Sequence, residues 1–176
     1  MNKPAKAKRT IVRFCPGIEV EGFEFPDGTY YVSITTASEA IGYNKNWLSR
    51  SIGRSGNTFK AITRAGFTNF ISEVVTPSDG GEQASKLISI DDFARLILYA
   101  ASRGKKEAMA LNMALTKMSL TDFFRDAFGA RPLTIEEKRA AFYKTYVDSL
   151  SREDWLEMDR KEDRIILGSY LFLTGE

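Results

Sequence analysis

The sequence predicts an α+β fold, in which a small N-terminal antiparallel sheet with a helix-turn-helix is followed by a C-terminal helical bundle. Three observations predict it. Residues 10–34 form short runs of alternating apolar and polar side chains separated by Gly and Pro, the pattern of half-buried strands. Residues 34–53 combine two short helical patterns around a glycine. From Asp91 onward, apolar residues recur every three or four positions, the spacing of a buried helix face.

The N-terminal strands are defined by their turns. Residues 10–14 are rich in β-branched side chains and are followed by the turn pair Pro16-Gly17. Residues 18–25 alternate apolar and acidic positions, which predicts a strand with one solvated face. Pro26-Asp27-Gly28 suits a tight hairpin turn, after which residues 29–34 return as a third strand. We expect a three-stranded sheet, with a further strand element over residues 67–75.

The helix-turn-helix pattern follows the third strand directly. Residues 35–43 predict a short helix that ends at Gly42, where glycine tolerates a positive φ. Asn44 is a candidate N-cap for a second helix over Lys45–Gly53. At about 100° per residue, the two sides of this second helix differ in character. Trp47, Leu48, Ser51 and Ile52 share one arc, and Asn46, Ser49, Arg50, Gly53 and Arg54 share the other.

The C-terminal half is predicted to be helical. Ser89 or Asp91 begins a helix that Gly104 ends, with a buried face of Phe93, Leu96, Ile97 and Ala100. A second helix over Lys105–Met118 carries Ala108, Leu111, Leu115 and Met118, and a short helix over 122–128 ends at Gly129. Thr134 and Glu137 have the capping-box spacing for a helix through Leu150. A short helix from Ser151 and an apolar last helix ending at Gly175 complete the prediction.

The charge distribution favours a nucleic-acid partner. Residues 1–70 hold ten Lys and Arg residues against five acids, whereas residues 71–176 hold fifteen against eighteen. Between Glu39 and Glu73 the chain has five cations and no acid. Such an uncompensated segment attracts phosphates, and Arg and Asn are the side chains that bond bidentately to guanine and adenine. The alternative is the solvated face of an ordinary pair of helices.

The candidate DNA-binding residues follow from these patterns. Asn46 and Arg50 are expected to read base edges in the major groove, and the neighbouring cations to hold phosphates. The basic N-terminal arm, residues 1–9, either tracks phosphates or a minor groove or acts as a solubilising tail. The complete set is Lys45, Asn46, Ser49, Arg50, Arg54, Lys60 and Arg64, with Lys8 and Arg9 from the arm.

Catalytic functions are largely excluded by composition. The chain has no histidine and one cysteine, Cys15, which removes histidine-based acid–base chemistry, Cys/His zinc sites and an intramolecular disulfide. Glu136-Glu137-Lys138 keeps a Mg²⁺-dependent nuclease as an alternative, although Glu is also favoured in the first turn of a helix. We expect no enzyme activity, no cofactor and no metal. The single cysteine and the absence of a long apolar run predict a cytoplasmic, nucleoid-associated protein that does not cross a membrane.

Residues 27–64 resemble a known family. The order and spacing of four segments match the KilA-N domain, which is related to the APSES-type DNA-binding fold. The segments are a hairpin turn with Asp27-Gly28, a Tyr-containing strand over 29–34, a helix that begins at Thr35, and Trp47-Leu48 followed by Arg50. The turn between the helices is shorter than usual, and Asn46 stands where the family varies. A fainter likeness, to the helical segment that follows such domains, runs from Ile88 through Asp91-Asp92-Phe93, Gly104 and Ala108 to Phe128-Gly129.

The resemblance implies a DNA-binding regulator of phage, plasmid or mobile-element type, related to antirepressors. It divides the chain into the arm, a KilA-N-like domain over 10–75, a loop over 76–85 and a helical domain over 86–176. We expect a homodimer through the helical half, because Lys105–Met118 and Ile165–Leu173 are strongly apolar; the alternative is that these segments pack within one chain. A non-catalytic protein-interaction module, such as an inhibitor of a host protein, is the alternative function.

Overall fold

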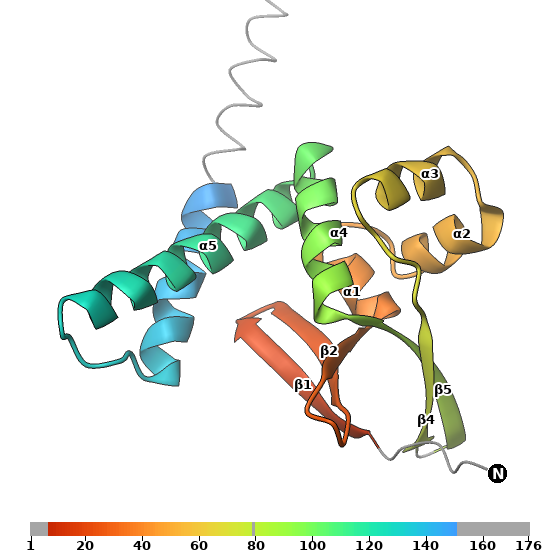
Figure 1. Ribbon diagram of the computed structural model, residues 1–176, viewed down its shortest axis with the longest axis horizontal. Helices are drawn as coiled ribbons and strands as arrows, with labels where there is room; N and C mark the ends of the chain where they lie inside the picture. The colour runs from red at the N-terminus through yellow and green to blue at the C-terminus, as the bar shows by residue number, and fades with distance from the viewer. Residues whose placement is uncertain (1–6, 79, 151–176) are drawn as a thin grey trace, which may run out of the picture.

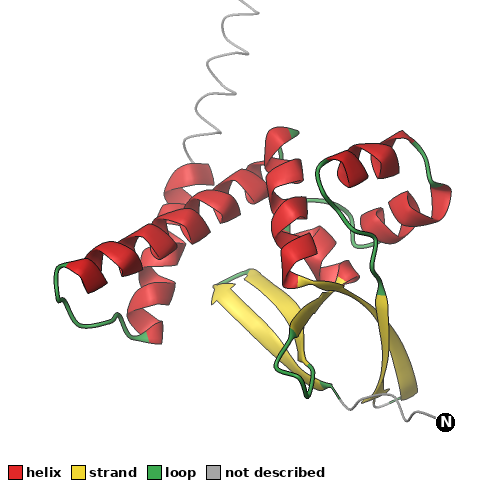
Figure 2. Ribbon diagram, in the orientation of Figure 1, coloured by secondary structure: helices red, strands yellow, loops and turns green. Residues whose placement is uncertain are grey.

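The protein has an α+β fold, as the sequence predicts. The computed structural model describes residues 7–78 and 80–150. The strands form a five-stranded antiparallel sheet, and the helices gather on one side of it (Figures 1 and 2). Three of the helices lie between the third and fourth strands along the chain, and the others follow the fifth strand. The sheet has the order β1-β2-β3-β5-β4, with β1 (Lys8–Cys15), β2 (Ile18–Glu24), β3 (Tyr30–Ser33), β4 (Ser72–Ser78) and β5 (Gly81–Ser89). The helices are α1 (Ile34–Ala40), α2 (Trp47–Arg54), α3 (Asn57–Arg64), α4 (Ile90–Ser102), α5 (Lys106–Ala127) and a helix over residues 135–150.

The first three strands and their turns agree with the sequence prediction. Gly17 and Gly28 have φ values of +84° and +81°, as their turns require. In the second turn, the Asp27 carboxylate accepts hydrogen bonds from the Thr29 hydroxyl at 2.6 Å and from the Thr29 backbone N–H at 3.0 Å. These bonds hold the pKa of Asp27 below its ordinary value. The hairpin between β2 and β3 is therefore stabilised locally.

The sheet is larger than predicted, and the predicted loop over 76–85 is wrong. Residues 76–78 belong to β4 and residues 81–85 to β5, and in this pair of strands Val75 pairs with Ala84 and Thr76 with Gln83. The segment has Gly, Ser, Pro and Gln in place of an alternating apolar pattern, so its sequence does not predict a strand. Its strands pair through backbone hydrogen bonds, which do not require such a pattern. Leu87 at the end of β5 is fully buried and pairs with Ser33 of β3. The sheet therefore continues through residue 89, past the predicted domain boundary.

The predicted helices need three corrections. The second helix begins at Trp47, so Asn46 and not Asn44 occupies its N-cap position. A separate helix, α3, follows it without having been predicted. The break predicted near Met118 is absent, because α5 continues to Ala127. Ser and Thr in a helix cost only tenths of a kcal/mol relative to Ala, so without Gly or Pro the helix continues.

One hydrophobic core joins the two halves of the chain. Phe93, Leu96, Ile97 and Ala100 of α4 are buried in it, as predicted. Ala108, Leu111 and Ala114 of α5 join the same core, with Leu115 and Met118 packed against it. The apolar stripe predicted for dimerisation therefore packs within the chain. The second predicted stripe, Ile165–Leu173, and the helices predicted after Leu150 lie outside the described residues.

The helix over residues 135–150 packs back against α5. Lys138 Nζ forms an ion pair with Asp122 Oδ2 of α5 at 2.8 Å. Phe142 and Tyr146 are buried in the core, and burial raises the pKa of Tyr146 to about 12. The helix begins with the predicted capping box: Glu137 N–H donates to Thr134 Oγ1 at 3.2 Å, and Thr134 N–H donates to Glu137 Oε2 at 2.9 Å. None of the described helices is long and apolar enough to cross a lipid bilayer.

Candidate nucleic-acid interface

The turn between α1 and α2 is built from local hydrogen bonds. Gly42 has a φ of +85°, and the Tyr43 backbone N–H donates to the Ser38 carbonyl oxygen at 2.9 Å. Asn44 shapes the turn: its Oδ1 accepts from the Asn46 N–H at 3.0 Å, and its carbonyl oxygen accepts from the Trp47 N–H at 2.8 Å. Asn44 therefore has an asparagine-turn role just ahead of α2, in place of the predicted N-cap.

Stacked aromatic rings fix α2 to the body of the protein. Trp47, the first residue of α2, stacks on Tyr43 with ring centroids 4.0 Å apart and planes 6° apart. Its ring also lies 6.3 Å from that of Tyr99 in α4, at 22°. Leu48 is fully buried and Ile52 is half-buried. The predicted packing arc of α2 is confirmed, and the opposite arc faces solvent.

Helix α3 continues the same surface after a two-residue turn. Ser55 has a φ of +46°, which reverses the chain. Ile62 of α3 is fully buried. Gly66 ends the segment with a φ of +97°, packed so closely that a Cβ there would lie 3.1 Å from Arg95 Cδ. Thr68 then hydrogen-bonds to the buried Asp92 of α4 through both its N–H, at 2.9 Å, and its hydroxyl, at 2.6 Å. Both ends of the α2–α3 segment are thus tied to α4.

The predicted polar residues of this segment are all exposed. They are Lys45, Asn46, Ser49, Arg50, Arg54, Lys60 and Arg64, and within residues 7–78 and 80–150 none of their cations forms an ion pair. Ser49 Oγ donates to the Asn46 carbonyl oxygen at 3.0 Å. We call this set the α2–α3 basic surface. An exposed cation without an internal acid keeps its charge available to an external anion.

The cations that α2 and α3 contribute to the α2–α3 basic surface lie in two neighbouring regions. Arg50 and Arg54 line one hollow of about 430 Å³ together with Trp47 of α2 and Asn57 of α3. Lys60 and Arg64 do not line it; spaced three and seven residues from Asn57, they share the face of α3 on which Asn57 lies. The surface therefore continues from the guanidinium groups of α2 to the cations of α3.

The placement of Lys8 and Arg9 corrects the predicted N-terminal arm. Both residues belong to β1, across the molecule from α2 and α3 (Figure 1). Lys8 Nζ lies 3.6 Å from Glu24 Oε2, and Arg9 forms an ion pair with Glu21. The antiparallel register of β1 and β2 sets Lys8 opposite Glu24 and Arg9 opposite Phe23, two positions from Glu21, which the sequence pattern of a basic tail does not reveal. Residues 1–6 lie outside the described residues.

Two further cations approach the interface from the turn between α4 and α5. The Arg103 guanidinium lies 5.4 Å from the centroid of the Tyr99 ring, and Lys105 Nζ lies 4.4 Å from that of Tyr43. Sequence reasoning missed both, because about fifty residues separate them from the end of α2 and no local pattern connects them. Burial raises the pKa of the Tyr43 hydroxyl, with a smaller increase from Tyr99.

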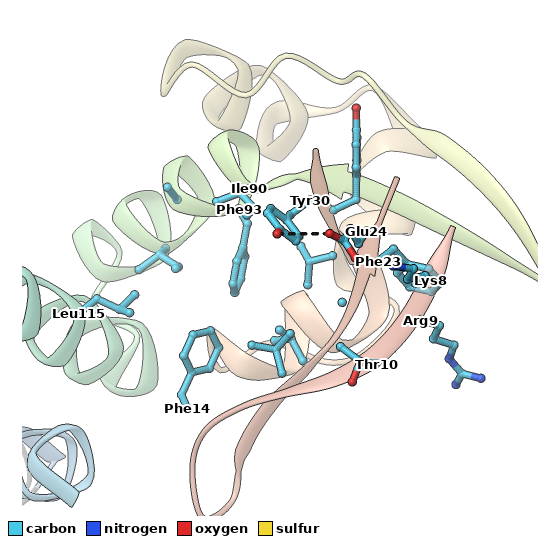
Figure 3. A pocket seen from close by; sticks show the side chains of 17 residues that line it. Lys8, Arg9, Thr10, Phe14, Phe23, Glu24, Tyr30, Ile90, Phe93 and Leu115 are labelled. Carbon is cyan, nitrogen blue, oxygen red and sulfur yellow. Dashed lines mark hydrogen bonds and ion pairs between the residues drawn. The ribbon is translucent and has the colours of Figure 1, made fainter. Parts of the chain in front are cut away.

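A larger cavity lies elsewhere and is apolar. It measures about 640 Å³ and lies between one face of β1–β3 and helices α4 and α5. Phe14 and Phe93 point toward each other across it, whereas Arg9 points away (Figure 3). The polar pair at its edge, Tyr30 hydroxyl and Glu24 Oε1, is 3.5 Å apart. This cavity is separate from the α2–α3 basic surface.

The residues of the predicted nuclease motif have structural roles. Glu137 belongs to the capping box and also binds Arg131 through both oxygens, at 2.5 and 2.8 Å. The Arg131 hydrogen bond is the main reason that the pKa of Glu137 falls to about 2. Lys138 is paired with Asp122. The described part of the chain contains no group of three or more His, Cys, Asp or Glu residues that could hold a metal ion.

Comparison of the chain with protein-family models, with curated proteins and with solved structures finds no match. The resemblance of residues 27–64 to the KilA-N domain stays a prediction.

Proposed function

We propose that this protein is a non-catalytic, sequence-specific regulator that binds double-stranded DNA through the α2–α3 basic surface. One observation carries the proposal: a helix anchored by Trp47 and Leu48 presents Asn46, Arg50 and Arg54 to solvent, and no acid among the described residues forms an ion pair with these cations. A rigid helix with an Asn/Arg face meets the requirements for reading base edges in a major groove. The resemblance to KilA-N regulators of phages and mobile elements supports the same function. We propose a cytoplasmic, nucleoid-associated location for such a regulator.

The roles of the residues follow from their positions. Asn46 and Arg50 lie four apart on one side of α2 and would bond to bases. Lys45, Arg54, Lys60 and Arg64, with Ser49 as a hydroxyl contact, would hold the phosphates on either side. Phosphate contacts fix the position of the protein on the duplex, whereas base contacts select the sequence.

The test is selection from a random duplex library at about 150 mM salt, which suppresses purely electrostatic binding. Recovery of a defined motif is expected. On that motif, Arg50→Ala should cost about 1–3 kcal/mol and relax selectivity at one position, whereas Lys60→Ala should weaken all duplexes similarly. Lys117→Ala, an exposed lysine of α5, serves as the matched control. A selection without enrichment, or full affinity in both variants, would remove this surface from the proposal.

We further propose that the regulator acts as a homodimer through the helical half. The far end of α5 carries large apolar side chains in solvent: Phe123, Phe124 and Phe128 are 74%, 64% and 84% exposed. Such a cluster is unusual on the surface of a monomer and fits a contact between copies. A two-fold dimer would bind a palindromic site.

The same aromatic cluster favours a second candidate function, binding of a host protein without DNA. Salt separates the two functions. Binding through phosphates weakens steeply as salt rises, with a slope of about 0.9 for each phosphate neutralised. An apolar protein contact lacks that dependence. A salt-insensitive complex with a host protein, formed by a chain whose duplex pool shows no enrichment, would establish the interaction module instead.

A further inference from the structure

We propose that the DNA-binding surface extends to the turn between α4 and α5, where Arg103 and Lys105 each contact a backbone phosphate beside α2. This inference rests on the proposed function and adds to it two phosphate contacts from a part of the chain distant in sequence.

A row of three aromatic rings places both cations. The rings of Tyr43, Trp47 and Tyr99 follow one another, with centroid separations of 4.0 and 6.3 Å. Lys105 lies over Tyr43 at 4.4 Å, and Arg103 lies over Tyr99 at 5.4 Å. Because Trp47 is the first residue of α2, the positions of the two cations are set relative to the helix that would enter the groove.

The charges of these cations have no acidic partner in the part of the chain that the structure describes. Glu107, two residues after Lys105, has its carboxylate beside Gly42. A ring stabilises a cation only weakly and occupies none of its hydrogen-bond donors. Lysine keeps three N–H donors and arginine five, so both can donate to a phosphate while stacked.

Helix stability accounts for the position of Arg103 but not for that of Lys105. Arg103 is the C-cap residue of α4, where a positive charge is favoured by the helix dipole. Lys105 is the N-cap residue of α5, where a positive charge opposes the dipole and its side chain accepts no capping hydrogen bond. Lys105 thus has an unfavourable position in the helix, lies over a ring and has no acidic partner among the described residues. Binding of an external anion accounts for a lysine at this position. Beside a DNA-reading helix that anion is a backbone phosphate.

The stacked geometry also reduces the cost of binding. A lysine or arginine side chain that samples many rotamers in the free protein loses conformational entropy when a phosphate immobilises it. Rings that already restrain Arg103 and Lys105 lower that cost. We therefore expect these two residues to contribute to affinity on every sequence, without selecting among bases.

The test compares the salt dependence of affinity for wild type and the double variant Arg103→Gln/Lys105→Gln, using a fluorescent duplex recovered in the selection. Each lost phosphate contact should lower the slope of log Kd against log salt by about 0.9, so the double variant should lose about 1.8. The selected motif should not change. Lys117→Gln, on an exposed part of α5, is the control and should keep the wild-type slope.

Two measurements separate a lost contact from a damaged fold. Thermal unfolding midpoints should agree between wild type and the double variant within a few degrees. The charge-conserving variant Arg103→Lys/Lys105→Arg should keep the wild-type slope. If Arg50→Ala weakens binding but Arg103→Gln/Lys105→Gln keeps both the wild-type slope and affinity, the extension is wrong and the proposed function stands. If wild type binds no duplex, both proposals fail.

Discussion

At the residue scale, Asp92 shows how one buried side chain positions the candidate site. The residue is fully buried, and its carboxylate accepts two hydrogen bonds from Thr68, at 2.9 and 2.6 Å. Arg95 Nη1 lies 3.4 Å away, and the Asp92 N–H donates to Ser89 Oγ at 3.1 Å. One carboxylate thus joins the start of α4 to the chain that leaves α3. Asp91, its exposed neighbour, makes a matched comparison.

We predict that Asp92→Ala lowers the free energy of unfolding by about 1–3 kcal/mol, because it removes two hydrogen bonds that a charged carboxylate accepts from Thr68 and its ion pair with Arg95. Asp91→Ala removes only a favourable charge at a helix N-terminus and should cost less than about 1 kcal/mol. Urea denaturation of both variants measures the difference. Equal losses would show that the Thr68–Asp92 contact contributes nothing beyond helix electrostatics.

At the element scale, the helix over residues 135–150 depends on a charged capping box. Glu137 accepts from the Thr134 N–H and from Arg131, and its pKa is lowered to about 2 from an ordinary value of 4.5. A lowered folded-state pKa means that ionised Glu137 contributes stability above the unfolded-state value. That contribution is lost as the pH falls from about 4.5 to 2.

We predict that wild type is more stable than Glu137→Gln above pH 4.5 and that this advantage disappears between pH 4.5 and 2. Thermal unfolding followed by far-ultraviolet circular dichroism across this range provides the measurement. The unfolding temperature of Glu136→Gln, a change at the exposed adjacent position, should depend on pH in the same way as that of wild type. A constant difference between wild type and Glu137→Gln down to pH 2 would contradict the role of the carboxylate.

At the scale of the whole molecule, the structure places the expected dimer contact on a different part of α5 from the one that the sequence suggested. The stripe of Lys105–Met118 is occupied by the core of its own chain, whereas the far end of α5 presents Phe123, Phe124 and Phe128 to solvent. These three residues follow the position at which the sequence suggested a helix break. The continuation of α5 therefore creates the apolar surface that the dimer proposal needs.

We predict that light scattering of wild type at micromolar concentration gives about twice the 19.8 kDa chain mass. Phe123→Asp/Phe128→Asp should give a folded monomer, because both side chains are exposed and their loss leaves the core intact. Leu98→Asp, at an exposed apolar residue of α4, should remain dimeric. A wild-type mass near that of one chain would end the dimer proposal.

The sequence alone determined the features that depend on neighbours within about four residues. The two arcs of α2, the positive φ of Gly42, the buried face of α4 and the Thr134–Glu137 capping box are all local. They follow from helix periodicity and from the conformational freedom of particular residues. For this reason, the fold class and the exposed cations of α2 could be predicted without coordinates.

Only the tertiary structure decided which distant segments meet. Pairing of β4 with β5 turned a predicted loop into two strands, and the register of β1 against β2 brought Lys8 and Arg9 into ion pairs with acids. The aromatic row brought Lys105 to Tyr43, across about sixty residues. Backbone pairing in a polar hairpin and contacts between remote side chains have no period in the sequence, because their energy depends on which surfaces the completed core brings together.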